Sequence, residues 1–168
     1  AAGCTSVVKM APQSALFQTE LLRCLTEVPQ LTAGVVNFYS CTGREPSESL
    51  VVSSNVDVIS FTGSVRVGQR IMASAAPTLK RLNLELGGKA PAIVFADADP
   101  KAIAAQLAAA ATIAAGQQCT ALDRVLAHES LIEPLREALA AHFRSISVGP
   151  ATEQDSMMGP LIDIASRD

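Results

Sequence analysis

The sequence predicts an α/β fold, with a parallel sheet wound by helices on both faces and then the first half of a second α/β domain. Two observations support this prediction. Short β-branched runs alternate with helical patterns in the first half of the chain, and the alternation restarts after Gly87-Gly88. The 168 residues are 49% hydrophobic and 17% charged, which suffices for a sizeable core. The glycine pair therefore divides the chain into domains of residues 1–87 and 88–168.

Four strands and three helices are expected before the glycine pair. Short apolar or β-branched runs predict strands at residues 5–10, 34–39, 56–61 and 81–86. Apolar residues at helical spacing predict helices at residues 13–28, 46–52 and 65–76. Pro12, Pro29 and Pro77 separate these elements, because proline fixes φ and removes a backbone donor.

The second half repeats this strand and helix order. The expected elements are strands at residues 91–95 and 124–128, a helix at 100–115 and a loop at 149–160. Asp99 can cap the helix at its N-terminus, and Gly116 can end it. Ser130 and Glu133 have the spacing of a capping box, which predicts the start of a last helix.

Composition narrows the classes of function. The net charge of −3, the absence of a Lys/Arg block and the aromatic content of 4% argue against a nucleic-acid partner. The most apolar run, residues 102–115, is too short to cross a bilayer, so no membrane partner is expected. The cysteines have no metal-ligand spacing, so no metal site is expected. Four irregularly spaced thiols indicate a reducing compartment, and we predict a cytoplasmic protein.

The junction after the third strand is a candidate phosphate site. Gly63 permits close approach to the backbone, Ser64 offers a hydroxyl, and the following helix N-terminus presents unpaired N–H groups. An ordinary N-cap would explain the same residues. The spacing from Gly63 to Gly68 fits neither a P-loop nor G-x-G-x-x-G.

One of the four cysteines, Cys119, is a candidate nucleophile. Cys119 follows a long helix and a glycine, so it lies in a predicted turn, where a thiol can serve as a nucleophile if substrate reaches it. The alternative is a small buried hydrophobe, which is also our interpretation of Cys4, Cys24 and Cys41.

Two charged residues at strand ends are further candidates. Glu85 lies between two leucines in a strand expected to be buried, an environment that suits a general base working near neutrality. The alternative is a strand-end salt bridge to Arg81 or Lys89. Lys9 ends the first strand, where parallel sheets bind ligands at their carboxyl edge, and a solvated strand end is its alternative.

Together these motifs resemble the aldehyde dehydrogenase family. Leu84-Glu85-Leu86-Gly87-Gly88-Lys89-Ala90-Pro91 is similar to its glutamate signature, and residues 116–124 match its cysteine signature, G-Q-x-C-x-A-x-x-R. Phe61-Thr62-Gly63-Ser64 with Val67-Gly68 is similar to its nicotinamide-dinucleotide turn. The resemblance covers essentially the whole chain, and both signatures occur in the family's order and spacing.

The resemblance implies a Rossmann-like cofactor domain up to residue 87 and a catalytic domain from residue 88. It implies that Cys119 attacks an aldehyde to give a thiohemiacetal and then a thioester, with its N–H as one oxyanion donor. Glu85 would activate the water that releases the acid. The cofactor, NAD or NADP, would contact Lys9, Gly43, Gly63, Ser64, Val67, Gly68 and Leu86.

One departure from the family pattern concerns cofactor choice. Many NAD-using members carry a glutamate three residues after the lysine, and Pro12 stands there in this chain. Without that carboxylate a 2′-phosphate is not repelled, so we expect NADP to be tolerated. Cys41 and Ser47 stand where members often have glycines, so that side of the cleft is expected to differ in shape.

Both ends of the chain look cut, so we expect part of a longer polypeptide. The resemblance places further cofactor, substrate and oligomerisation segments outside these residues. The 168-residue chain alone is therefore expected to be inactive, and the full-length parent to be a homo-oligomer, a dimer or tetramer. The aldehyde cannot be named from these residues. The alternatives to an aldehyde dehydrogenase are a non-catalytic dinucleotide-binding or structural fragment and a thiol hydrolase.

Overall fold

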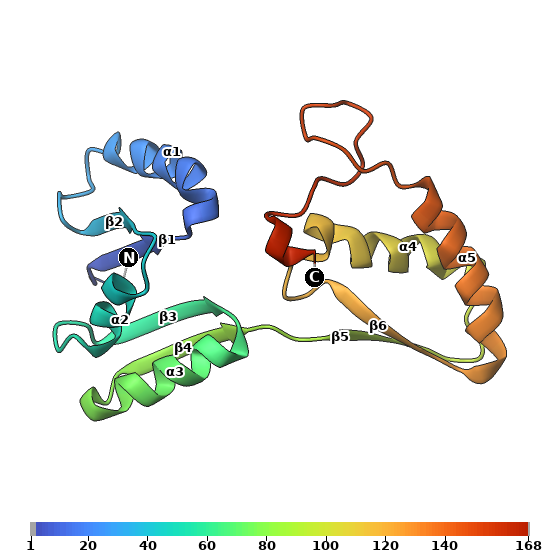
Figure 1. The fold of residues 1–168 in the computed structure, drawn as a ribbon, viewed down its shortest axis with the longest axis horizontal. Helices are drawn as coiled ribbons and strands as arrows, with labels where there is room; N and C mark the ends of the chain where they lie inside the picture. Colours follow the sequence, from blue (N-terminus) through green and yellow to red (C-terminus); the bar gives the residue numbers. More distant parts are fainter. Residues whose placement is uncertain (1–2, 168) are drawn as a thin grey trace. The chain divides into compact units, whose positions relative to one another are not determined.

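The computed structural model describes residues 3–167 and divides into two compact units, Ala1–Glu85 and Leu86–Asp168. Residues 1, 2 and 168, which begin and end the predicted domains, lie outside the described residues. Strands and helices alternate along both units (Figure 1). The predicted α/β class with parallel strands is confirmed, but the strands form three two-stranded sheets in place of one continuous sheet.

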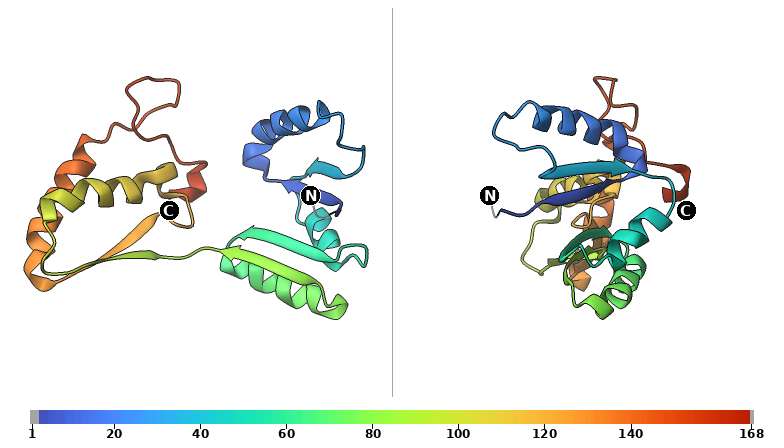
Figure 2. Two further views of the ribbon diagram at one scale, coloured as in Figure 1. Left: turned by 180° about the vertical axis from the view of Figure 1, so that it is seen from behind. Right: turned by 90° about the vertical axis from the view of Figure 1, so that its left-hand side faces the viewer.

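The first strand pair joins β1 (Ser6–Met10) to β2 (Val36–Ser40) in parallel, with Val8 opposite Phe38. α1 (Ala15–Thr26) connects the two strands and lies over one face of the pair in every view (Figures 1 and 2). Because the strands are parallel, their carboxyl ends lie at the same edge, where this fold class binds ligands.

The second strand pair joins β3 (Val58–Gly63) to β4 (Arg81–Leu86), and both arrows point the same way in Figure 1. α3 (Val65–Ala75) connects them. The residues buried by α3 are Gly68, Ile71 and Ala75, which share one face of the helix. This face anchors α3 and fixes the position of its N-terminus just after β3.

Polar contacts complete the first unit. α2 (Glu45–Val52) is linked to α3 by an ion pair of 2.6 Å between Glu48 and Arg70, both of which are exposed. The Lys80 ammonium donates to the carbonyl oxygens of Ser53 and Val56 and so ties the turn after α2 to the start of β4.

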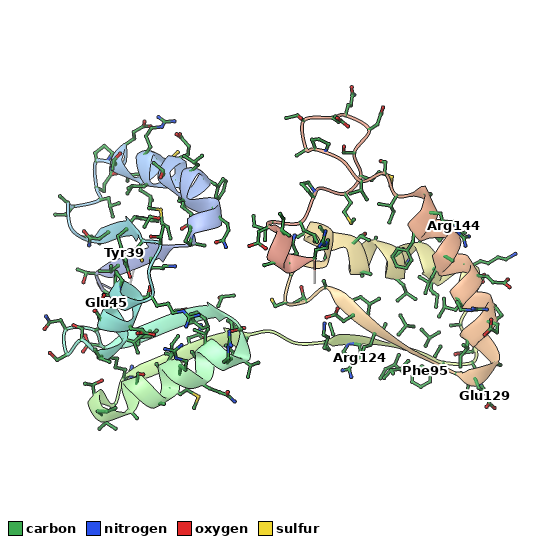
Figure 3. The ribbon with its side chains drawn as sticks, viewed as in Figure 1. Tyr39, Glu45, Phe95, Arg124, Glu129 and Arg144 are labelled. Atoms are coloured by element: carbon green, nitrogen blue, oxygen red, sulfur yellow. The ribbon has the colours of Figure 1, made fainter. Side chains whose placement is uncertain are left out.

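The second unit packs two helices on one face of a parallel strand pair. β5 (Ala90–Val94) lies beside β6 (Leu122–Ala127), and α4 (Pro100–Thr112) and α5 (Ile132–Ser145) lie above them in Figure 1. The core consists of Val94, Ala104 and Leu135. Alanine at the contact lets the helices approach closely. The other face is open, and Figure 3 shows Phe95 directed away from both helices.

The helix predicted at residues 100–115 begins as expected and ends early. The Asp99 carboxylate caps it by accepting from the N–H groups of Lys101 and Ala102, at 2.9 and 3.4 Å. α4 stops at Thr112, because the next residues leave right-handed helical geometry. Alanine carries no local signal for this ending, since it is the strongest helix former.

The predicted capping box at Ser130 and Glu133 is wrong. A 3-10 turn, Glu129–Leu131, precedes α5, so Ser130 lies inside that turn rather than at the helix N-cap. The ring Nδ1 of His128 accepts from the Ser130 N–H at 3.3 Å. Glu133 instead pairs with Arg136 one turn further along the helix.

Two further observations apply to residues 3–167. None of their helices has the length and apolarity needed to cross a membrane. No three His, Cys, Asp or Glu side chains gather there in a group that could hold a metal ion.

Candidate active site

Cys119 lies at the tip of a turn that follows α4. The turn Gln118–Ala121 is closed by the Ala121 N–H, which donates to the Gln118 carbonyl at 2.9 Å. The Cys119 thiol is exposed and free. Neither its own N–H nor that of Thr120 has an acceptor among the described residues. A reachable thiol beside unpaired N–H groups can attack a carbonyl carbon and stabilise the oxyanion that forms.

The residues around Cys119 explain why its signature has this composition. Gly116 adopts φ +73°, a left-handed conformation that favours glycine. Ala121 is 2% exposed, so a larger side chain would not fit there. The Arg124 guanidinium donates from Nε and Nη2 to the Lys89 carbonyl at 3.2 and 2.9 Å. A Cβ on Gly88 would lie 3.9 Å from the Cys119 carbonyl oxygen. Gly88 and Lys89, within the glutamate signature, are therefore held beside the Cys119 turn.

A second polar contact holds this turn from the other side. The Gln117 side chain accepts through Oε1 from the Ile162 N–H at 3.0 Å and donates through Nε2 to the Ala114 carbonyl at 3.2 Å. No role for Gln117 or Arg124 is predicted from the sequence. Their presence in the cysteine signature was the available signal, but the partner of Gln117 is distant in sequence and could not be predicted.

Glu85 is exposed at the end of β4, so the prediction of a buried carboxylate is wrong. The strand alternates, and Leu82, Leu84 and Leu86 are half-buried while Arg81, Asn83 and Glu85 face outward. The alternative of a salt bridge is not seen either. Glu85 makes no ion pair within the described part of its unit, and Lys89 pairs with Asp123 at 3.3 Å. The carboxylate is thus available to a ligand.

The phosphate-site candidates lie at the start of α3. Ser64 is the N-cap of α3, and its hydroxyl accepts from the Val67 N–H at 3.3 Å, as the ordinary N-cap interpretation predicts. The first turn contains no acidic side chain, so nothing there repels an anion. Gly68 is buried, and Val67 is exposed. A Cβ on Gly63 would lie 2.5 Å from the Phe61 ring, so the ring occupies the space that a side chain at this position would need.

Lys9 and Gly43 lie near the carboxyl edge of the first strand pair, whereas Leu86, the last cofactor candidate, is the half-buried final residue of β4. Lys9 is exposed next to the end of β1 and is in register with Tyr39 of β2. Gly43 follows β2, and its carbonyl oxygen lies 3.5 Å from the Cys41 Sγ, which also lies 3.9 Å from the Ser47 hydroxyl. The two non-glycine residues noted from the sequence thus contact each other.

The interpretation of the other cysteines as buried hydrophobes is wrong. Cys4 and Cys24 are exposed, and Cys41 is half-buried. Single apolar positions on the surface are common, so burial of a lone cysteine was a weak inference.

Comparison with known proteins agrees with the motifs. The family model described as the aldehyde dehydrogenase family matches residues 1–168. The chain is 41% identical over 165 residues to the non-phosphorylating aspartate-semialdehyde dehydrogenase of Halomonas elongata, covering 96% of this chain and 33% of that protein. It is 40% identical over 162 residues to the phenylacetaldehyde dehydrogenase of Pseudomonas fluorescens, covering 96% of this chain and 32% of that protein.

Solved structures give the same result. The crystal structure of betaine aldehyde dehydrogenase from Staphylococcus aureus in complex with NAD+ matches with a TM-score of 0.93 and 32% identity, covering 98% of this chain and 33% of that one. The chain thus spans about a third of the length of the relatives it matches. The family match extends over every residue, and the chain belongs to the aldehyde dehydrogenase family.

Proposed function

We propose that this chain supplies the nucleophile, Cys119, and the general base, Glu85, of an NAD(P)-dependent aldehyde dehydrogenase. The observation that carries the proposal is the exposed Cys119 thiol, held in a hydrogen-bonded turn with two unpaired N–H groups. Membership of the family supports it, as does the outward-facing carboxylate of Glu85. The first unit would belong to the cofactor domain and the second to the catalytic domain.

The chain's own residues account for two steps. The Cys119 thiolate forms a bond to the aldehyde carbon, and the carbonyl electron pair moves to an oxygen that the Cys119 N–H stabilises. A bound nicotinamide would supply the hydride acceptor, and loss of the hydride from the carbon bonded to Cys119 would leave a thioester on that residue. Glu85 then takes a proton from water, the hydroxide adds to the thioester carbon, and the carbon–sulfur bond breaks. The products are the free thiolate and the carboxylic acid, and Glu85 returns its proton to solvent.

The residues present fit a dinucleotide. The first turn of α3 offers N–H groups that have no intrahelical acceptor, with no acidic side chain beside them. In this proposal Ser64 and the α3 turn through Gly68 bind the pyrophosphate, and Lys9 binds the adenosine ribose. Gly43 and Leu86 are the other residues that we propose to contact the cofactor. The neighbouring structure from Staphylococcus aureus is a complex with NAD+, and Pro12 places no carboxylate in this chain that would repel the 2′-phosphate of NADP.

The substrate class is an aldehyde, since relatives are named for aspartate semialdehyde, phenylacetaldehyde and betaine aldehyde. Four irregularly spaced cysteines fit a reducing compartment, and we propose a cytoplasmic homo-oligomeric enzyme. The 168-residue chain alone is still expected to be inactive.

The test measures aldehyde-dependent NAD(P)H formation with a panel of aldehydes, on the complete gene product and on the 168-residue chain. Cys119→Ser is expected to abolish turnover. Glu85→Gln is expected to lower steady-state turnover about 10²–10⁴-fold while leaving a burst of NAD(P)H, because only release of the acid needs the base. Cys24→Ser, which removes an exposed thiol in the other unit, is the matched control.

Unchanged turnover in Cys119→Ser would overturn the assignment of the nucleophile. NAD(P) binding by the complete gene product without turnover on any aldehyde would favour the non-catalytic alternative. Turnover by the 168-residue chain at the rate of the complete product would contradict its expected inactivity.

A further inference from the structure

Gln117 connects the nucleophile turn to a segment 45 residues away. Its Oε1 accepts from the Ile162 N–H at 3.0 Å, and its Nε2 donates to the Ala114 carbonyl at 3.2 Å. Its backbone N–H also donates to the Ala114 carbonyl, at 3.1 Å. The side-chain amide of Gln117 therefore bonds to both segments: its oxygen accepts from Ile162, and its nitrogen donates to Ala114.

The backbone that Gln117 holds is intrinsically unfavourable. Ala114 has φ 48° and ψ 39°, and Ala115 has φ 56° and ψ 34°. Both alanines are left-handed, a conformation in which Cβ crowds the following carbonyl oxygen. Such residues keep this geometry only when contacts around them hold it. Both donations from Gln117 end on Ala114, the first of these two residues.

The partner segment is itself anchored and faces the turn. The Gly149 N–H donates to the Met158 carbonyl at 3.0 Å, and the Met157 N–H donates to the Ser147 carbonyl at 3.0 Å. A cavity of about 270 Å³ lies between the two segments, lined by Thr112, Ala114, Ala115, Met157, Met158, Gly159 and Pro160. The hydrogen bond between Gln117 and Ile162 joins the two segments that line this cavity.

We propose that Gln117 is a positioning residue: it fixes the left-handed turn against segment 157–162 and thereby sets the place of the Cys119 thiol two residues later. We call this attachment of the turn to segment 157–162 the clamp. The role of Cys119 rests on the proposed function, whereas the clamp does not. Gln118 offers a matched contrast. It has the same side chain and adjoins Cys119, yet its Nε2 reaches only the Thr120 hydroxyl, at 2.9 Å, within the turn.

Three variants test the clamp on the 168-residue chain. Gln117→Met removes both side-chain bonds at similar size. Gln117→Glu keeps an acceptor for Ile162 and loses the donor to Ala114. Gln118→Met is the control. Amide hydrogen exchange at Ile162 is expected to accelerate about five- to tenfold in Gln117→Met, the worth of one hydrogen bond, and to change less than about twofold in the other two.

The thiol provides the second measurement. Iodoacetamide alkylation is followed by mass spectrometry at Cys119 and, in the same sample, at the exposed Cys24 of the other unit. Gln117→Met is expected to slow alkylation of Cys119 relative to Cys24 by about threefold or more, because the thiolate loses its fixed place beside unpaired N–H groups. Gln118→Met is expected to leave the ratio unchanged. If Gln117→Met fails to fold, Gln117→Glu is expected to show a smaller slowing in the same direction.

The third measurement separates positioning from general destabilisation. In the complete gene product, Gln117→Met is expected to lower kcat about tenfold or more with KM within about twofold, since misplacing a reacting group affects the chemical step. Unaltered kcat in an active enzyme, or an equal effect of Gln118→Met, would overturn the proposal. If no aldehyde is turned over by any form, the proposed function fails, and faster Ile162 exchange with slower Cys119 alkylation would still support the clamp.

Discussion

The left-handed turn before Cys119 predicts that Ala114→Gly stabilises the second unit. Ala114 has φ 48° and ψ 39° and is exposed, so the loss of its methyl group removes little packing. The left-handed conformation costs an L-residue about 1–2 kcal/mol. Glycine avoids that cost but gives up about 0.5–1 kcal/mol in backbone entropy relative to alanine. The net expected gain in the free energy of unfolding is about 0.5–1 kcal/mol.

A matched control lies in the preceding helix. Ala105 is exposed within α4, where the backbone is right-handed and glycine has no advantage. Ala105→Gly is expected to lower the free energy of unfolding by about 1 kcal/mol. The same chemical change should therefore have opposite signs at two positions nine residues apart.

The assay must report on the second unit alone. The chain has no tryptophan and a single tyrosine, Tyr39, which lies in the first unit. Intrinsic fluorescence therefore does not report on unfolding of the second unit. Native-state hydrogen exchange of the slowest amides in α4, β5 and β6 gives the free energy of opening for the second unit. Destabilisation by Ala114→Gly equal to that by Ala105→Gly would show that residue 114 is not left-handed, and the account of the turn would fail.

Three other predictions concern the first unit. Lys80→Met removes two charge-assisted hydrogen bonds to the carbonyls of Ser53 and Val56 and should lower the stability of the unit by about 1.5–3 kcal/mol, measured by tyrosine fluorescence in urea; an unchanged midpoint would contradict it. Tyr39→Phe removes a buried hydroxyl that has no hydrogen-bond partner among residues 3–167 and should raise stability by about 1 kcal/mol in urea unfolding followed by circular dichroism, whereas a loss of that size would point to an ordered water on the hydroxyl. Pro12→Glu restores a carboxylate near the proposed ribose site and should lower kcat/KM for NADP relative to NAD in the complete gene product; a strong preference for NAD in the unaltered protein would refute the role given to Pro12.

The elements with strong local signals could be predicted from the sequence. Residues 81–86 were expected as a strand, and β4 has those bounds. The Asp99 cap followed from an acceptor placed just before a proline that starts a helix. The α/β class followed from the alternation of strands and helices.

The errors arise where a neighbouring or distant residue decides the local structure. The His128 ring, not the Ser130 hydroxyl, caps the turn before α5. Two left-handed alanines follow the early end of α4, and the nearby hydrogen bond between Gln117 and Ile162 joins residues that no local pattern links. The exposure of Glu85 could have been inferred, because strict alternation with leucines places it on the opposite face of β4.

The candidate site was predicted from its signatures, and the roles of its residues stay predictions. The cysteine signature indicated a turn, and Cys119 is exposed in one. What the signature could not indicate was the reason for each accompanying residue. The buried methyl of Ala121 and the hydrogen bonds of Arg124 become intelligible only once the chain segments lie side by side.

The bond from Arg124 to Lys89 has a consequence for how freely these positions can vary during evolution. The guanidinium binds the backbone carbonyl of residue 89, so any amino acid can stand there without loss of the acceptor. The Lys89 side chain contributes only an exposed pair with Asp123, which is worth little. At position 124 a planar fork with two aligned donors is needed, and lysine cannot replace it. Natural variation is thus free on one side of this contact and constrained on the other.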